Sequence, residues 1–131
     1  MNKEFVSYEI ALELKELGFD EPCFGWYQDK TLRIDVNANQ SIKFHEHLGR
    51  FKGCFLAPTF SQAFRWFREK YNIVSEINVY STTDGYSFSF KILCKKYTEF
   101  IEANNAWVTY EEAELSCLKK LIEIVKQPKK D

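Results

Sequence analysis

Apolar residues recur at helical spacing in three segments of the chain, and the three segments open with the same pattern. Each opening has a hydroxyl residue first, an aromatic residue second and an alanine fifth. A hydroxyl at this position accepts hydrogen bonds from backbone N–H groups that otherwise lack a partner in the first helical turn. The openings predict helices over residues 8–17, over residues 60–71, and from residue 110 to the residue before Pro128. The three openings are Ser7–Ala11, Thr59–Ala63 and Thr109–Ala113.

Cap residues mark where these helices begin and end. Gly18 follows the first helix, and Phe19 is placed to fold back on Leu14 in a left-handed glycine cap. Gln62 and Glu112 each lie three residues after the hydroxyl residue of their helix, a spacing that predicts capping boxes. The predicted buried stripe of the second helix consists of Phe60, Ala63, Phe64, Phe67 and Tyr71.

Runs of strand-forming residues predict two hairpins. The first joins residues 23–27 to residues 32–36, and the second joins residues 77–82 to residues 86–94. The second contains Asp84-Gly85, a pair that favours a turn in which both central residues have positive φ. Apolar and polar residues alternate in its second strand, which predicts one buried and one mostly polar face. The residues expected on the buried face are Tyr86, Phe88, Phe90, Ile92 and Cys94.

The order of elements predicts an α+β fold. A further short strand is expected over residues 42–47, while residues 48–56 and 95–108 favour no single structure. We expect one domain over residues 1–127 and a solvated tail over residues 128–131. In this domain three helices pack on an antiparallel sheet of four or five strands, as a two-layer or an α-β-α sandwich. The pattern leaves open whether the first helix covers the same sheet face as the other two.

Composition and charge limit the classes of protein to which the chain can belong. The chain has 131 residues, of which 45% are hydrophobic and 17% aromatic, so we expect a core built on packed rings. Its net charge of -1 provides no overall field that would hold a polyanion or an anionic membrane. No apolar run approaches the ~18 residues of a membrane span, and the N-terminus lacks the pattern of a signal peptide. Four widely spaced cysteines indicate free thiols in a reducing cytoplasm.

Three stretches carry a resemblance to a group of known proteins. They are CFGWYQD at 23–29, FLAPTFSQAFRWFREKYNI at 55–73 and WVTYEEAELSCLKKLIEIVK at 107–126. With them the chain resembles small uncharacterised proteins carried by phages, prophages and plasmids of gut Bacteroidetes. More distantly, its order of helix, sheet, hairpin and helix is similar to that of phage proteins with an α-β-α sandwich domain. The resemblance implies a cytoplasmic accessory protein of a mobile element and carries over no functional residues.

His45 and His47 form the candidate metal site. They lie on one face of the expected strand over residues 42–47. Neutral imidazoles bind zinc or nickel when a third ligand is present, here Cys54 or Asp35. The alternative is a solvated edge strand without a metal. The sequence implies no cofactor otherwise, and a small metal-dependent hydrolase is the third functional hypothesis.

The helix over residues 60–71 carries the candidate partner-binding residues Trp66, Arg65, Arg68 and Lys70. Trp66 lies about 120° from the centre of the predicted stripe, so we expect it to be exposed unless it packs beneath a neighbouring loop. Tryptophan and arginine dominate the energetics of protein interfaces. The same groups can stack on bases and hold phosphates. The sequence therefore favours a protein-binding surface here, with a nucleic-acid-binding module as the alternative.

The sequence assigns no catalytic residue. Glu114 projects into the apolar stripe of the last helix, but no paired acid, base or nucleophile is identified near it. Cys23 and Cys54 are the candidate reactive thiols, and neither has a histidine partner in the pattern. The expected function is therefore that of a non-enzymatic accessory protein that binds another protein through exposed aromatic and basic groups. The edge of the predicted sheet also allows a homodimer.

Overall fold

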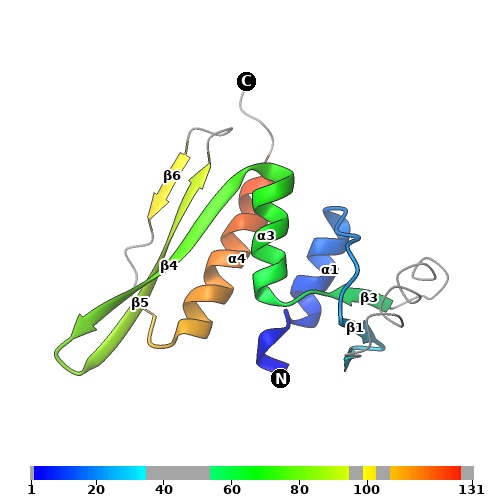
Figure 1. Cartoon of the computed structure of the whole chain (residues 1–131), viewed down its shortest axis with the longest axis horizontal. Helices are drawn as coiled ribbons and strands as arrows, with labels where there is room; N and C mark the ends of the chain where they lie inside the picture. The colour runs from blue at the N-terminus through cyan, green and yellow to red at the C-terminus, as the bar shows by residue number, and fades with distance from the viewer. Residues whose placement is uncertain (1, 35–53, 95–98, 103–106, 128–131) are drawn as a thin grey trace. The chain divides into compact units, whose positions relative to one another are not determined.

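The structure of the chain is a computed structural model, which describes residues 2–34, 54–94, 99–102 and 107–127 (Figure 1). The chain divides into two compact units, Met1–Gln62 and Ala63–Asp131. Helices and antiparallel strands confirm the predicted α+β class. The prediction of one sheet of four or five strands is wrong, because the described strands pair in two separate sets of three. No helix in the described ranges is long and apolar enough to cross a bilayer.

Unit 1 combines one α-helix with a sheet in the order β2-β1-β3, in which both neighbours run antiparallel to β1. The helix packs against β3, where the rings of Tyr8 and Phe55 meet edge-on with 5.6 Å between their centroids. The elements of unit 1 are η1 (Asn2–Glu4), α1 (Tyr8–Glu16), β1 (Gly25–Gln28), β2 (Thr31–Ile34) and β3 (Cys54–Ala57).

Both predicted caps of α1 are confirmed. The Ser7 hydroxyl accepts a hydrogen bond from the Ile10 N–H at 3.3 Å. Gly18 has a φ of 96°, and the Phe19 N–H donates to the Leu14 carbonyl at 2.9 Å. This is the glycine cap in which the chain reverses and places an apolar residue back on the helix. The helix itself ends one residue before the predicted limit.

The first hairpin is confirmed, and its strands begin and end closer to the turn than predicted, although residues 35 and 36 of the predicted second strand lie outside the described residues. Asp29 and Lys30 form its two-residue turn, and their φ angles are 50° and 67°. Positive φ at both central positions is the type I′ geometry, whose twist matches that of the flanking strands. Asparagine and glycine are the residues that tolerate this geometry best, so the turn holds backbone strain, chiefly at Lys30.

The segment before α1 is bonded to the rest of unit 1. The Val6 N–H donates to the Pro58 carbonyl at 3.0 Å, and the buried Tyr27 hydroxyl donates to the Val6 carbonyl at 2.6 Å. The ring of Phe5 lies against Gly25, where an added Cβ would come within 2.8 Å of two ring atoms. A glycine is therefore needed in β1 where the ring approaches the strand.

β3 occupies part of a stretch for which the sequence favoured no structure. All four residues of Cys54–Ala57 are buried, so the strand shows no alternation of apolar and polar residues. A short apolar run of this kind does not distinguish a strand from a buried helix by periodicity. The strand predicted over residues 42–47 lies outside the described residues.

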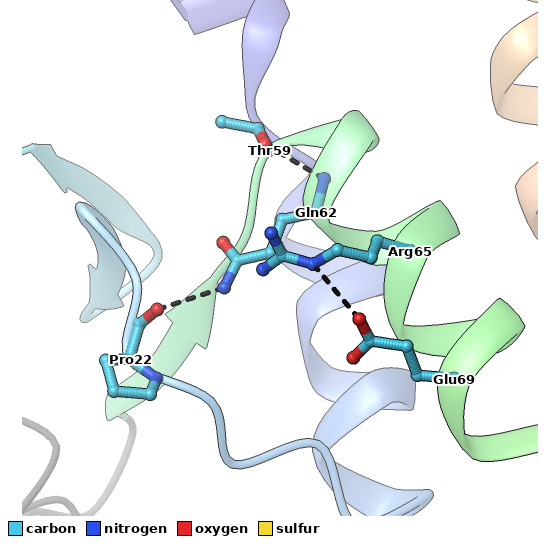
Figure 2. Close-up of polar contacts among 5 residues, drawn as sticks. All are labelled: Pro22, Thr59, Gln62, Arg65 and Glu69. Carbon is cyan, nitrogen blue, oxygen red and sulfur yellow. Dashed lines mark hydrogen bonds and ion pairs between the residues drawn. The ribbon is translucent and has the colours of Figure 1, made fainter.

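The helix α3 (Phe60–Tyr71) has the predicted bounds, and the division between the units falls inside it. The Thr59 hydroxyl accepts from the Gln62 N–H at 3.2 Å, as predicted. The second half of the predicted capping box is wrong. The Gln62 side chain donates through Nε2 to the Pro22 carbonyl at 2.9 Å, which joins the start of the helix to the segment before β1 (Figure 2).

Unit 2 contains an antiparallel sheet in the order β4-β5-β6, and the last helix packs on β4 and β5. The Thr109 hydroxyl caps this helix by accepting from the Glu112 N–H at 3.1 Å, as predicted. Beyond β6, Trp107 pairs with Phe88 through two backbone hydrogen bonds of 2.8 and 2.9 Å. The elements of unit 2 after α3 are β4 (Ile73–Thr82), β5 (Gly85–Cys94), β6 (Glu99–Glu102) and α4 (Tyr110–Lys126).

The second hairpin lies where it was predicted, but its turn differs. Thr82 pairs with Gly85, so Thr83 and Asp84 are the two loop residues. Gly85 has a φ of 140°, whereas Thr83 and Asp84 are not among the described residues with positive φ. The freedom of the glycine is therefore used at the first residue of β5 and not inside the turn.

The core of unit 2 lies between α4 and one face of the hairpin. Burial in β5 follows the prediction for Phe90, Ile92 and Cys94. The predicted burial of Tyr86 is wrong, since this residue is 72% exposed. The reason is that the hairpin extends past the start of α4 (Figure 1). Val125 near the end of α4 is half-buried, whereas six residues of the helix are buried. They are Ala113, Cys117, Leu118, Leu121, Ile122 and Ile124.

Candidate interaction surfaces

Three of the predicted partner-binding residues lie on the surface of α3, and the fourth is buried. Arg65, Arg68 and Lys70 are exposed, whereas Trp66 is 4% exposed. The rings of Trp66 and Phe67 meet edge-on with 5.2 Å between their centroids. The expectation that Trp66 is an exposed anchor is therefore wrong, because its indole shares the buried side of the helix with Phe67.

The exposed charges of α3 are partly matched within the helix. Arg65 Nε lies 3.9 Å from Glu69 Oε1 (Figure 2). Lys70 Nζ lies 4.9 Å from the centroid of the Trp66 ring, whose π-electrons attract the cation. Exposed ion pairs of this kind add little stability. They do reduce the positive charge that α3 presents to a phosphate backbone.

A second surface lies at the end of the β4–β5 hairpin. Val79 is 61% exposed and Tyr86 is 72% exposed. Both belong to the sheet face that includes Phe88, because Phe88 pairs directly with Val79 and lies two residues from Tyr86 on β5. Phe88 also meets the exposed ring of Tyr110 edge-on, with 5.9 Å between their centroids. We call Val79, Tyr86, Phe88 and Tyr110 the hairpin-end patch.

Acidic groups border the hairpin-end patch. Glu111 and Glu112 are exposed in the first turn of α4, and Asp84 is exposed in the hairpin turn. Partial burial and then the charge of half-buried Glu114 raise the pKa of Tyr110, so its hydroxyl stays protonated near neutral pH. The patch is therefore apolar at its centre, with a neutral hydroxyl and an acidic border.

The four cysteines are free and buried. Burial, assisted by the charge of Glu21, raises the pKa of Cys23 to about 12. Burial likewise raises the pKa of Cys117 to about 12 and raises the pKa of Cys54. The thiolate is the nucleophilic form of cysteine, and a thiol with a raised pKa holds little of it near neutral pH. The two candidate reactive thiols, Cys23 and Cys54, are thus not activated in this structure.

The predicted metal site lies mostly beyond the described part of the chain. His45, His47 and Asp35 fall outside the described residues, and Cys54 is buried in β3. Within the ranges that the structure describes, no three His, Cys, Asp or Glu side chains are grouped to hold a metal ion. The metal hypothesis therefore stays a prediction from the sequence.

The chain matches no protein-family model, and it has no significant match among curated proteins or solved structures. The resemblance to phage and plasmid proteins thus stays a prediction.

Proposed function

We propose that this chain is a non-enzymatic module that binds another protein through the hairpin-end patch. Tyr86 carries the proposal, because it is 72% exposed at the end of an ordered strand. Tyrosine is among the residues that contribute most binding energy in protein interfaces. Val79 and Tyr110 extend the exposed apolar surface on the same side, and such contiguous patches mark interaction sites.

The acidic border specifies the chemistry of the partner. Glu111, Glu112 and Asp84 repel a polyanion and attract cations, so the partner has an apolar centre surrounded by Lys or Arg. Interactions between such exposed charges are screened by salt. Binding should therefore weaken as ionic strength rises, while the apolar contacts persist.

The basic side of α3 supports the alternative, a nucleic-acid-binding module. Arg68 is exposed there, together with Arg65 and Lys70. This alternative predicts salt-sensitive retention of the purified protein on DNA or RNA, which Arg68→Ala would reduce. The further proposal of a phage or mobile-element accessory protein is supported by the resemblance of residues 23–29, 55–73 and 107–126.

Quantitative affinity capture from a lysate of gut Bacteroidetes cells, the hosts that the resemblance implies, followed by calorimetry with each purified partner, tests the proposal. Tyr86→Ala should weaken binding of a genuine partner at least about tenfold, or 1.4 kcal/mol. Leu93→Ala is the matched control, because Leu93 is exposed on the opposite face of β5 and should leave affinity unchanged. Equal affinity of wild type and Tyr86→Ala would refute the patch. A loss of affinity with Arg68→Ala but not with Tyr86→Ala would place the binding site on α3 instead.

A further inference from the structure

β4 forms one edge of the sheet in unit 2, and the backbone groups on its outer side can be identified. Phe88 exchanges both of its backbone hydrogen bonds with Trp107, so its N–H and C=O point away from β4. Val79 is the partner of Phe88, and its N–H and C=O therefore point away from β5. Orientation alternates along a strand. The outward residues of β4 are thus Ile73, Ser75, Ile77, Val79 and Ser81.

Within the described part of unit 2, these outward groups form no hydrogen bond. β4 also lacks the features that protect sheet edges, which are Lys, Pro and bulges. Its 10 residues, IVSEINVYST, contain one charge, Glu76, and pair with β5 without interruption. The other described edge strands differ, since β2 contains Arg33, β6 begins and ends with Glu, and β3 has only 4 residues, all of them buried. β4 is therefore the described edge best suited to pair with another strand.

We propose that β4 pairs antiparallel with β4 of a second copy of this chain, with Ile77 opposite Ile77. This register uses every outward residue, because Val79 then lies opposite Ser75 and Ser81 lies opposite Ile73. Paired residues in this arrangement exchange two hydrogen bonds each. The proposal goes beyond the proposed function, which concerns a different protein and the hairpin-end patch.

The same register matches the side chains on the outer sheet face. Val74 lies opposite Tyr80 of the second copy, and these side chains are 49% and 45% exposed in the single chain. The Tyr80 hydroxyl is within 2.7 Å of the Ser89 hydroxyl, which fixes the ring on this face. Aromatic and β-branched residues stabilise each other across antiparallel strands.

Charge is also compatible with two copies. Glu76, the one charged residue of β4, lies opposite Asn78 of the second copy in this register, and the two-fold symmetry repeats the contact. An amide can donate to a carboxylate, so no like charges meet. A register in which Glu76 faces Glu76 would lose this match.

Sedimentation equilibrium over a range of concentrations tests the dimer. The wild type should dimerise, and Val79→Pro should raise the dissociation constant at least about tenfold, because proline removes an outward N–H without removing a bond to β5. Val79→Thr keeps the N–H and the side-chain shape, so it is the matched control and should dimerise like the wild type. A wild type that stays monomeric at every concentration, or equal behaviour of the two variants, would overturn the proposal.

Two substitutions at one position test the register without depending on proline. Asn78→Lys should strengthen the dimer through two new contacts with Glu76, and Asn78→Asp should weaken it by repulsion. A change in the same direction for both variants would reject this register. Tyr86→Ala should leave the dimer unchanged because Tyr86 lies on β5, so failure of the proposed function and failure of the dimer are distinguishable.

Discussion

Replacing Gly25 by alanine should destabilise unit 1, because the added methyl group meets Phe5. The new Cβ would lie 2.8 Å from two atoms of the Phe5 ring and 3.0 Å from the Ala57 carbonyl oxygen. Optimal contacts between carbon atoms are about 3.5–4.0 Å. The ring is buried, and Phe5 is paired with Thr59, so it has little room to withdraw.

The expected cost follows from two opposing effects. Overpacking of a buried site costs about 1–3 kcal/mol. Alanine has less freedom than glycine in the unfolded chain, which returns about 0.4–1 kcal/mol. Gly25→Ala should therefore lower the free energy of unfolding by about 1–2 kcal/mol. Domains of this kind have a total free energy of unfolding of about 5–15 kcal/mol, so the loss is readily measured.

Urea unfolding followed by circular dichroism would measure this cost, and a double-mutant cycle would assign it to the ring. Combining Gly25→Ala with Phe5→Leu should cost at least about 0.5 kcal/mol less than the sum of the single changes, because the smaller side chain relieves the contact. Gly85→Ala is the control, since a Cβ there meets no atom within 4 Å and its cost comes from a φ of 140°. Its cost should add independently to that of Phe5→Leu. Wild-type stability of Gly25→Ala, or additivity with Phe5→Leu, would refute the argument.

Three further predictions concern the turn, the N-terminal segment and pH. Lys30→Gly should stabilise the chain by about 1 kcal/mol, because residue 30 has a φ of 67°; Lys30→Ala should show no such gain in thermal unfolding. Tyr27→Phe should cost about 1–2 kcal/mol in urea unfolding, because it leaves the buried Val6 carbonyl without its donor; an unchanged midpoint would contradict this. Cys117 has a pKa of about 12 in the folded chain against an ordinary value of 9.0, so the folded state keeps a proton that the unfolded state loses. Stability should therefore be unaffected by this group below pH 9 and should fall above it by about 1.4 kcal/mol per pH unit. Cys117→Ala should show a shallower fall, and an equal slope would count against the raised pKa.

Local patterns predicted the helices well. The hydroxyls of Ser7, Thr59 and Thr109 all accept from the backbone three residues on, because capping depends on neighbours in the sequence. Gln62 shows the limit of this reasoning. Its side chain donates a hydrogen bond to the Pro22 carbonyl, 40 residues away, instead of accepting one from the backbone N–H of Thr59.

Pairing between distant strands was not predictable in the same way. β3 follows β2 after 19 residues outside the described ranges and still pairs with β1, which completes a separate sheet in unit 1. The four buried residues of β3 give no periodic signal. The sequence also did not predict that Asp29 and Lys30 form a type I′ turn, since neither residue is the asparagine or glycine that marks one.

The candidate surfaces depended on side-chain burial, which alternation and helical spacing determine only in part. The alternation of apolar and polar residues predicted that Tyr86 is buried, but the β4–β5 hairpin extends past the start of α4 (Figure 1). The local sequence pattern does not indicate how far the hairpin extends beyond the helix. Helical spacing placed Trp66 outside the stripe, although the buried residues of α3 are Ala63, Trp66 and Phe67. The size of the indole was the available signal, because a large ring favours burial even at the margin of a stripe.

The burial of all four native thiols gives a practical route to these experiments. A cysteine introduced at an exposed position beside either surface, such as Glu69 or Thr83, would carry the accessible sulfhydryl, so a maleimide dye should label it selectively at neutral pH. A fluorophore on either surface could then report contact by quenching or anisotropy, without first replacing any cysteine of the core.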